Sequence, residues 1–487
     1  MSTDKRAPKR TNGVGRLRTL PSVDRVMSHP AMADARARLP HGVVLSAARS
    51  EVDAARETLL QGDTAAPGLG EIATRAAERA WGLAAPSLRP VINATGVVIH
   101  TNLGRAPLSQ LALQSMATVS AYSNLEYDLE AGERGSRYVH AASILRQVTG
   151  CEDALVVNNN AAGLVLTLAT LARGREVVLS RGQSVEIGGG FRIPEVMKQS
   201  GATLVEVGTT NRTYVRDYAE ATTPETALLL RVHASNFRIV GFAMSPSLDE
   251  LAALAHERGI LMVDDVGSGA LLDTTRYGLA PEPMVQASLE AGADLVLFSG
   301  DKLLGGPQCG VIVGKKDLVA RLKKHPLARA LRVDKLTLAA LEATLLHYLW
   351  GEAESHVPVW RMISMPAEEL RHKAEAWAQQ LSQAGVKCTV EPGQSAIGGG
   401  SLPGETLPTF LVSINPGSES AAGHFAALLR RYPVPVITRV ERGSVLLDPR
   451  TVQPVEEEVL LSVVGGQWSA VSGRRSVVGG RRSVVSG

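Results

Sequence analysis

The chain has 487 residues, of which 45% are hydrophobic and 20% charged, a composition typical of a globular protein with room for about three domains of ~150 residues each. Its net charge of +3 is too small to indicate nucleic-acid binding by itself, and its three cysteines lack the spacing of a disulfide framework or a zinc site. No run of ~18 uncharged apolar residues predicts a membrane span, and the N-terminus lacks the apolar stretch of a secretory signal, so we expect a cytoplasmic protein.

The first domain along the chain is expected to be helical. Residues 1–16 are polar and basic without periodicity, which indicates a disordered tail. Residues 17–88 are rich in Ala, Arg and Glu, with helical patterns at 46–60 and 71–81. The basic tail and a second cluster within 315–335 offer local positive charge for a polyanion, although charge runs of this kind are usually solvated surface.

The remaining chain predicts two α/β domains. Between 89 and 348, short apolar runs alternate with helical segments, which is typical of a mostly parallel sheet covered by helices. Strands are predicted there at 154–157, 176–179, 203–207, 227–232, 261–264, 295–298 and 311–313. A smaller domain at 349–466 is expected to hold a helix at 367–384 and strands at 388–390, 410–414 and 445–447. From 467 onward we expect a low-complexity tail, because 474–480 and 481–487 repeat each other.

The strongest chemical signal is a lysine at the end of a predicted strand. The strand 295–298 leads into a Ser-Gly-Asp-Lys segment that ends at Lys302, and two glycines follow at 305 and 306. A lysine in this position can reach an open cleft, and glycines let the backbone approach a flat ligand closely. The pattern suits a lysine that carries pyridoxal 5′-phosphate (PLP) as a Schiff base. Taken alone, an ordinary solvated loop lysine would be the commoner explanation.

Two more strand ends carry residues that fit the same cofactor. The strand 261–264 runs into Asp264 and Asp265, and in PLP enzymes a carboxylate in such a place pairs with the pyridine nitrogen. The sequence does not decide which aspartate does so, and metal binding or helix capping are alternatives. His233 ends the strand 227–232, where it could stack on or hydrogen-bond the ring, although a lone histidine is more often structural.

A third strand end predicts a phosphate site. The strand 154–157 continues into Asn158, Asn159 and Asn160 and then a helix, whose first amide groups and dipole favour an anion. The alternative is that the asparagines only cap the helix. Because open α/β sheets bind ligands at the carboxyl ends of their strands, these positions together predict a PLP site. Its candidate residues are Lys302, Asn159, Asn160, Ala161, His233, Asp264, Asp265 and Ser299.

Several segments resemble, in order, those of bacterial selenocysteine synthases, the L-seryl-tRNA(Sec) selenium transferases. The resemblance covers about 20–465. Its segments are LPSVDR at 20–25, NATGV at 93–97, HTNLGR at 100–105, ERGSRY at 133–138, EIGG at 186–189, GTTNR at 208–212, the Lys302 segment, and RALRVDK at 329–335. So many long segments in one order are highly specific to this family.

The resemblance implies an aspartate-aminotransferase-like fold, PLP-dependent fold type I, in a ring-shaped homodecamer whose N-terminal domain helps to bind tRNA. It implies that Lys302 is the PLP lysine and that several arginines bind selenophosphate, the selenium donor. The matching arginines are Arg105, Arg134, Arg137, Arg329 and Arg332. Guanidinium groups suit a tetrahedral anion, and their alternative role is binding of tRNA phosphates.

The implied reaction converts L-seryl-tRNA(Sec) to L-selenocysteinyl-tRNA(Sec). The seryl amine displaces Lys302 from PLP, and the freed lysine removes the α-proton. Loss of the β-hydroxyl as water gives an aminoacrylyl intermediate, to which selenium adds. The main alternative is a paralogous fold type I PLP lyase that acts on a small free amino acid or amino sugar. Such relatives tend to lack the N-terminal domain and part of the arginine set. A tRNA-binding protein without catalysis is disfavoured by the intact Lys302 segment.

Overall fold

The computed structural model describes residues 19–61, 67–187 and 190–471. The chain divides into two compact units, Met1–Pro90 and Val91–Gly487. The basic tail 1–16 and the repeats 474–487, both expected from the sequence, lie outside the described residues. Within the described ranges, no helix is long and apolar enough to cross a membrane.

The first unit is a small helical bundle. Its helices are α2 (Val23–Ser28), α3 (Ala33–Arg38), α4 (His41–Leu60) and α5 (Leu69–Ala84). The Ser22 side chain caps α2 by accepting a hydrogen bond from the Arg25 amide. In α4 the buried residues recur three or four positions apart, with Ala47 and Ala48 adjacent, so they form one apolar stripe that packs against the other helices. Both segments predicted as helical, 46–60 and 71–81, lie inside α4 and α5.

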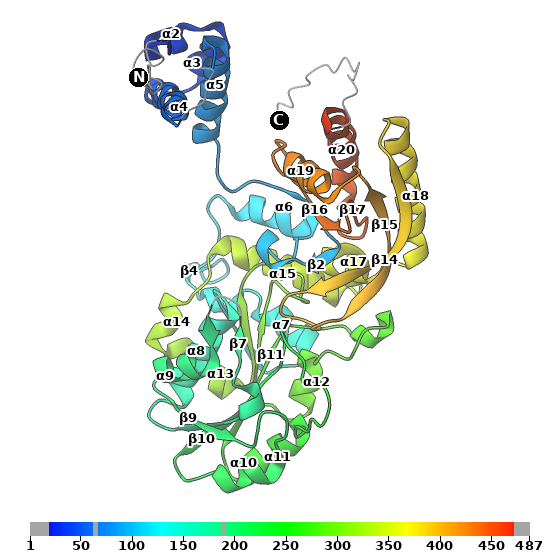
Figure 1. The fold of residues 1–487 in the computed structure, drawn as a ribbon. Coiled ribbons are helices and arrows are strands. Elements are labelled where there is room, and N and C mark those ends of the chain that lie inside the picture. Colours follow the sequence, from blue (N-terminus) through cyan, green and yellow to red (C-terminus); the bar gives the residue numbers. More distant parts are fainter. Residues whose placement is uncertain (1–18, 62–66, 188–189, 472–487) are drawn as a thin grey trace, which may run out of the picture. The chain divides into compact units, whose positions relative to one another are not determined.

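A seven-stranded sheet forms the centre of the second unit (Figure 1). Its order is β5 (Asp153–Val157), β13 (Gly310–Gly314), β12 (Leu295–Ser299), β11 (Leu261–Gly267), β10 (Thr226–Val232), β6 (Glu176–Ser180) and β9 (Thr203–Val207). Only β13 runs antiparallel to its neighbours, so the α/β class and the mostly parallel sheet predicted from the sequence are confirmed. All seven predicted strands are present.

Helices cover both faces of this sheet (Figure 1). Neighbouring residues of one strand, such as Val156 and Val157, belong to two separate apolar cores because side chains alternate between the faces. One core receives side chains from α7 (Ala142–Thr149), α10 (Val215–Ala221), α11 (Leu248–Glu257) and α15 (Lys335–Leu349). The other receives them from α8 (Asn160–Leu171), α9 (Ile193–Ser200) and α13 (Lys316–Lys324). Burial on both faces explains the continuous apolar runs of these strands.

A second sheet of six strands forms from two distant parts of the chain. Its order is β1 (Ile92–Ala94), β16 (Val436–Glu441), β17 (Ser444–Leu447), β15 (Thr406–Ile414), β14 (Cys388–Gly398) and β2 (Val97–Ile99). The strands β1 and β2 fall in the segment expected for the large domain, yet they pair in parallel with C-terminal strands. The sequence predicted parts of β14, β15 and β17 and missed β1, β2 and β16, of which β1 and β2 are only three residues long.

Three helices pack on this second sheet: α18 (Ala367–Gln383), α19 (Glu419–Arg430) and α20 (Glu457–Val471). Trp468 of α20 is buried and contacts Phe425 edge-on, with ring centroids 5.6 Å apart. The predicted start of the low-complexity tail, residue 467, is therefore too early, because α20 continues to Val471 and its Trp468 is buried. The division of 89–466 into two domains stays a prediction.

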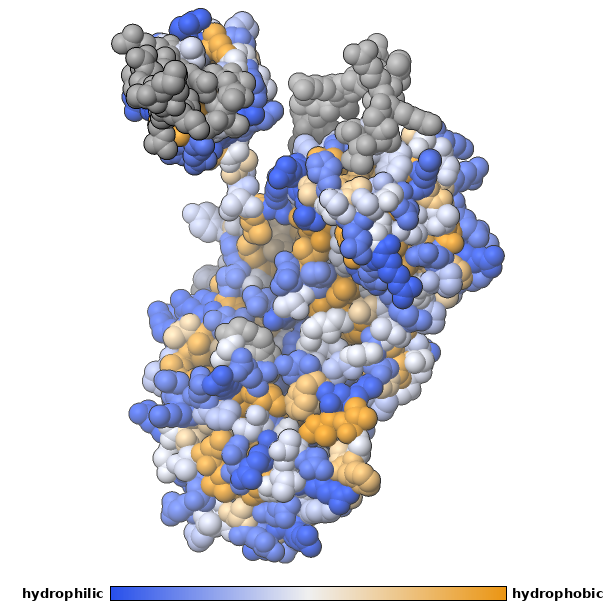
Figure 2. All heavy atoms as spheres, viewed as in Figure 1, coloured by the Kyte–Doolittle hydropathy of each residue, from blue (hydrophilic) through white to orange (hydrophobic). Residues whose placement is uncertain are grey.

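Shorter elements complete the second unit. The helices are α6 (Gln110–Val119), α12 (Val285–Glu290), α14 (Pro326–Ala330), α16 (Ala353–His356) and α17 (Pro358–Ser364), and the two small hairpins are β3–β4 (Tyr127–Asp128, Glu133–Arg134) and β7–β8 (Glu186–Ile187, Phe191–Arg192). On the visible face of this unit, apolar side chains are interspersed among hydrophilic ones (Figure 2).

Candidate active site

Lys302 lies at the carboxyl end of β12 and is only 8% exposed. Gly400, in the loop after β14, leaves room for its amine, because a Cβ atom there would lie 2.8 Å from Lys302 Nζ. A Cβ atom at Gly267 would lie at an ordinary contact distance of 3.7 Å from the same nitrogen. Gly400 also has a φ of +84°, which favours glycine. Burial lowers the pKa of the Lys302 amine, and the Asp265 carboxylate acts in the opposite direction.

The two aspartates at the end of β11 have different partners. Arg231 donates two hydrogen bonds of 2.7 Å to the carboxylate of Asp264, which is fully buried. Since successive strand residues face opposite sides of a sheet, Asp265 faces the other way. There it accepts a 2.8 Å hydrogen bond from Asn160 Nδ2, and burial raises its pKa to about 6. The geometry therefore separates an aspartate held by an arginine from one that faces the lysine.

The three asparagines after β5, Asn158, Asn159 and Asn160, which we call the asparagine turn, also have different partners. Asn159 Oδ1 accepts a 2.9 Å hydrogen bond from the Ala162 amide and caps α8, which was the alternative interpretation of this segment. Asn160 instead directs its amide to Asp265, and Ala161 lies in the first turn of α8. A Cβ at position 310 would lie 2.2 Å from the carbonyl oxygen of Asn159, so Gly310 is required for β13 to pass this turn.

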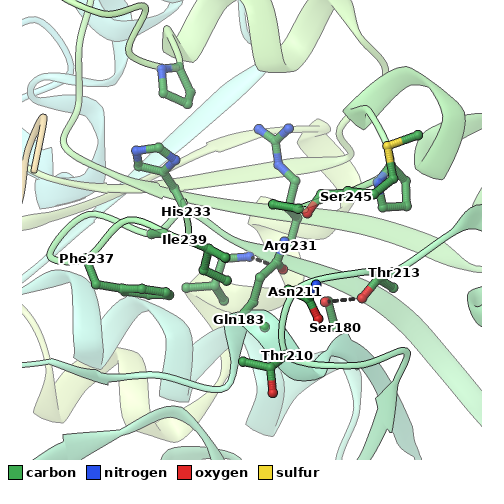
Figure 3. A pocket seen from close by; sticks show the side chains of 17 residues that line it. Ser180, Gln183, Thr210, Asn211, Thr213, Arg231, His233, Phe237, Ile239 and Ser245 are labelled. Carbon is green, nitrogen blue, oxygen red and sulfur yellow. Dashed lines mark hydrogen bonds between the residues drawn. The ribbon is translucent and has the colours of Figure 1, made fainter. Parts of the chain in front are cut away.

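His233 is fixed next to Asp265 and contacts a buried acid that the sequence analysis missed. Its amide donates a 2.9 Å hydrogen bond to the Asp265 carbonyl oxygen. Its Nε2 lies 3.3 Å from Oε2 of Glu282, whose side chain is 2% exposed. His233 also lines a cavity of about 310 Å³ together with Arg231 and Phe237 (Figure 3). Lys302 is not among the residues that line this cavity.

Three described residues linked to Lys302 carry a buried polar atom without a hydrogen-bond partner. Asn160 Oδ1 belongs to the residue that bonds Asp265, and Glu282 Oε1 and Asp301 Oδ1 belong to carboxylates that act on the pKa of Lys302. Unpaired buried polar groups are costly, so their concentration at one place indicates a polar ligand. The residues fit PLP, because an amine can bind its aldehyde and a buried carboxylate can pair with its ring nitrogen. We call Lys302, Asp265, Asn160, His233 and Glu282 the lysine centre.

Four of the five arginines singled out from the sequence line one pocket of about 200 Å³, which we call the arginine pocket. Its charged residues are Glu126, Arg134, Arg137, Arg329 and Arg332. Glu126 accepts hydrogen bonds of 2.8 and 2.5 Å from Arg137 and one of 3.1 Å from Arg134. These arginines, Arg137 first, lower the pKa of Glu126. Arg332 Nη1 lies 3.9 Å from the same carboxylate.

The arginine pocket borders the asparagine turn. Arg332 forms an isolated β-bridge with Val157, and the Asn158 amide donates a 2.9 Å hydrogen bond to the Leu331 carbonyl oxygen. Backbone contacts thus tie the pocket to the strand end that supplies Asn160 to the lysine centre.

Arg105 stands apart from the other arginines. Its Nη1 donates a 2.9 Å hydrogen bond to Asp301, the residue before Lys302, and its backbone adopts a φ of +64°. Ser299, the remaining candidate, is the last residue of β12 and is 7% exposed. Arg105 therefore lies at the lysine centre rather than in the arginine pocket.

Comparison with known proteins decides the family. A family model described as "L-seryl-tRNA selenium transferase" matches residues 91–453, and one described as "Selenocysteine synthase N terminal" matches residues 17–56. A curated L-seryl-tRNA(Sec) selenium transferase of Moorella thermoacetica is 49% identical over 91% of this chain and 95% of its own length. The chain belongs to the L-seryl-tRNA(Sec) selenium transferase family. A second relative, from Geobacter sulfurreducens, is 48% identical over 91% of this chain and 98% of its own length.

A solved structure agrees on the fold of this selenium transferase family member. The structure of a D-glucosaminate-6-phosphate ammonia-lyase superposes with a TM-score of 0.57, covering 79% of this chain and 97% of that one at 22% identity. As a member of this family the chain has PLP as its cofactor, and the superposition agrees with the PLP-dependent fold type I architecture.

The sequence analysis missed three residues of these sites in this selenium transferase family member, because no local sequence pattern marks them. Arg231 lies within an apolar strand like any other, and Glu282 is flanked only by two prolines. Glu126 lies in a short segment before the arginine motif. Their roles depend on which strands become neighbours, and a single sequence does not specify that.

Proposed function

We propose that the chain converts L-seryl-tRNA(Sec) to L-selenocysteinyl-tRNA(Sec) with selenophosphate as the selenium donor. The observation that carries the proposal is the buried amine of Lys302 beside the buried carboxylate of Asp265, in a chain of the selenium transferase family. The match spans 95% of the Moorella relative's own length, which supports the complete reaction rather than a part of it.

Lys302 would move the proton at the substrate's Cα. Bound PLP supplies an electron sink for the negative charge that develops at Cα. Burial lowers the pKa of the Lys302 amine, which favours the neutral form that can accept this proton at Nζ. The same group, once protonated, can deliver a proton to the departing β-hydroxyl as water forms. Lys302 is therefore proposed as both base and acid.

Asp265 would keep the ring nitrogen of PLP protonated. Among the described residues, the Asp265 carboxylate has no arginine partner, in contrast to Asp264, and Asn160 fixes its orientation. A cation beside Asp265 would stabilise its charged form, which burial disfavours in the cofactor-free protein. His233 and Ser299 are proposed as further cofactor contacts. The first turn of α8, at Ala161, is proposed to receive the phosphate through backbone amides.

The arginine pocket would bind the phosphate group of the selenium donor. Four guanidinium groups against one carboxylate leave a formal charge of 4 − 1 = +3 in about 200 Å³. Guanidinium groups bind tetrahedral oxyanions through paired hydrogen bonds. Arg105, at the lysine centre, is proposed to contact the reacting end of the donor. Binding of tRNA phosphates by the same arginines is the alternative. Separate titrations of the protein with selenophosphate and with tRNA distinguish the two roles.

The helical first unit is proposed to bind the tRNA, supported by its match to the N-terminal family model over residues 17–56. Assembly into a homodecamer is proposed from the family resemblance.

The decisive experiment supplies the protein with PLP, seryl-tRNA(Sec) and selenophosphate and then identifies the amino acid on the tRNA. Selenocysteine is the expected product. Unchanged serine on the tRNA, under conditions in which free serine is consumed, would overturn the proposal in favour of a lyase acting on small amino acids. Omission of selenophosphate serves as the control, since serine must then not become selenocysteine.

A further inference from the structure

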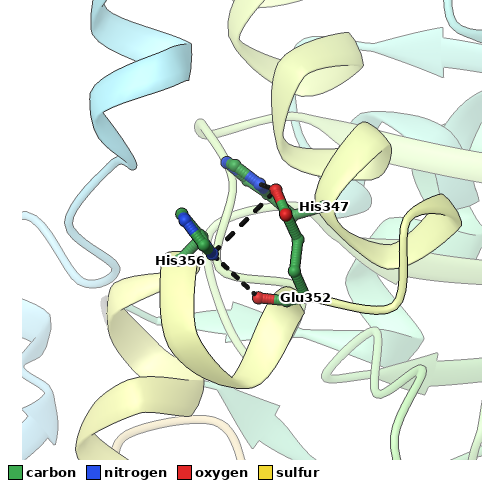
Figure 4. Close-up of side chains that lie close together, drawn as sticks. All are labelled: His347, Glu352 and His356. Carbon is green, nitrogen blue, oxygen red and sulfur yellow. Dashed lines mark hydrogen bonds and ion pairs between the residues drawn. The ribbon is translucent and has the colours of Figure 1, made fainter.

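Two histidines and a glutamate meet at the end of α15, outside the lysine centre and the arginine pocket (Figure 4). His347 lies in the last turn of α15, Glu352 precedes α16, and His356 ends α16. Backbone hydrogen bonds from the Glu352 amide to the His347 carbonyl (2.9 Å) and from the His356 amide to the Glu352 carbonyl (3.1 Å) close this segment. The three side chains are thus held on one compact turn.

Their potential ligand atoms already lie close together. Glu352 Oε1 is 2.7 Å from His347 Nδ1 and 3.9 Å from His356 Nδ1, and one ligand atom from each side chain lies within 4.8 Å of the others. A tetrahedral Zn²⁺ ion with bonds of ~2.0–2.1 Å places its ligands ~3.4 Å apart. The two separations from Glu352 Oε1 bracket this value, and the third pair lies within 4.8 Å, so shifts of about 1.4 Å or less would complete a three-ligand set.

His347 is preorganised as a ligand. Its side chain is 4% exposed, and its Nε2 lies 3.1 Å from Ser109 Oγ, which in turn caps α6. The Trp350 ring packs edge-on against the imidazole at a centroid distance of 6.2 Å. Metal-binding histidines commonly use their second nitrogen for a hydrogen bond of this kind, which fixes the ring and leaves the first nitrogen to the metal.

His356 supplies the movable ligand. Its ring stacks on that of His347 at 5.2 Å with an interplanar angle of 17°, so the in-plane lone pairs of the two rings run nearly parallel. Convergence on one ion requires the His356 ring to turn. Its side chain is 55% exposed and, among the described residues, its Nδ1 contacts the exposed Ser355 hydroxyl and Glu352, so the turn gives up the stacking on His347 but no buried hydrogen bond.

We propose that His347, Glu352 and His356 form a binding site for a transition-metal dication of the Zn²⁺ type, with water as the fourth ligand. Two imidazole nitrogens and one carboxylate oxygen match Zn²⁺, Co²⁺ or Ni²⁺ and disfavour Mg²⁺ and Ca²⁺, which prefer all-oxygen sites. The bound ion ties the end of α15 to α16. The site is separate from the proposed selenium transfer and does not depend on it.

The test is calorimetric titration of ZnCl₂ into the full-length PLP-bound protein, prepared without a polyhistidine tag and treated with chelator. We expect one Zn²⁺ per chain, bound at least tenfold more tightly by the wild type than by His356→Ala. The matched control is His372→Ala. His372 is also exposed, with carboxylate oxygens of Glu368 and Glu375 at 3.5 and 3.9 Å, but these lie at different ring nitrogens, and in the described part of the chain the three residues do not form a group of potential metal ligands. This control should bind Zn²⁺ like the wild type.

A second variant and a second readout exclude effects of misfolding. Glu352→Gln retains the side-chain size and should also lose the tight Zn²⁺ site, while the circular dichroism of both variants stays that of the wild type. Zn²⁺ should raise the melting temperature of the wild type and of His372→Ala but not of His356→Ala or Glu352→Gln. Equal Zn²⁺ affinity of the wild type and His356→Ala, or no binding by either, would mean that the cluster is an ordinary histidine–glutamate hydrogen bond and would overturn the proposal.

Discussion

The lysine centre and the arginine pocket are both rich in charge, but they hold it in opposite ways. In the lysine centre Lys302 and Asp265 are less than 10% exposed, and burial shifts the pKa of each toward its neutral form. In the arginine pocket Arg134 is 78% and Arg332 37% exposed while Arg137 is 13% exposed, and hydrogen bonds to arginine rather than burial lower the pKa of Glu126. Under the proposed roles, the groups that exchange protons are shielded from water, whereas most of the groups that attract an anion remain solvated.

The strongest test of this contrast is Lys302→Ala. Because this variant removes the only amine of the lysine centre, turnover should fall by at least ~10³-fold, within the ~10²–10⁴-fold that one acid–base group usually contributes. Binding of seryl-tRNA(Sec), measured by filter retention, should change less than about twofold. The exposed Lys316→Ala serves as the control and should retain wild-type turnover. Substantial activity of Lys302→Ala would remove this residue from its proposed role.

The two aspartates of β11 allow a comparison within the lysine centre itself. Asp265→Asn removes the charge that faces Lys302 and should lower turnover ~10²–10³-fold, the scale of one lost electrostatic contact in an active site. Asp264→Asn instead leaves Arg231 without its buried partner and should lower the free energy of unfolding by roughly 3–5 kcal/mol. Kinetics and urea unfolding of both variants check the assignment. The opposite pattern would show that Asp264 serves the cofactor.

The burial of Asp265 also predicts a pH dependence of stability in the PLP-free protein. Its folded pKa, about 6, lies above the ordinary value of 3.8, so the folded state holds this proton more tightly than the unfolded chain. The resulting stabilisation is present below the unfolded pKa and is lost as the pH rises through about 6. Relative to Asp265→Asn, the wild type should lose about 1 kcal/mol of unfolding free energy between about pH 5 and pH 7.5. Urea titrations at both pH values measure this, and a parallel response of the two proteins would refute it.

The residues of the lysine centre were easier to predict from the sequence than those of the arginine pocket. Strand ends are local signals, because apolar runs followed by Asp265, His233 and Lys302 can be recognised one at a time and a parallel sheet brings such ends together. The choice between Asp264 and Asp265 needed the position of Arg231 on the neighbouring strand. The alternation of side chains along a strand shows that the two aspartates face opposite sides of the sheet, but not which residues lie beside each of them. Likewise, Asn159 proved to be a cap only once its hydrogen bond was seen.

The arginine pocket was reached only through family resemblance. The motifs at 133–138 and 329–335 lie almost two hundred residues apart, and nothing in their local patterns indicates that they meet. The bridge between Val157 and Arg332 joins them to the asparagine turn, and such long-range pairing depends on the complete fold. The same limit explains why β1 and β2, three residues each, were missed as strands of the C-terminal sheet.

The smallest expected effect concerns the one acid of the arginine pocket. In the absence of an anion, Glu126 occupies the guanidinium groups of Arg134 and Arg137, so an incoming phosphate must compete with it. Glu126→Gln should therefore lower the KM for selenophosphate by about 2–5-fold, the scale of a partly exposed ion pair, with little change in kcat. The gain should shrink as salt is raised, because solvated charges are screened. An unchanged or higher KM would indicate that Glu126 positions the arginines, so that in this pocket, as at Asp264, a carboxylate holds a guanidinium in place.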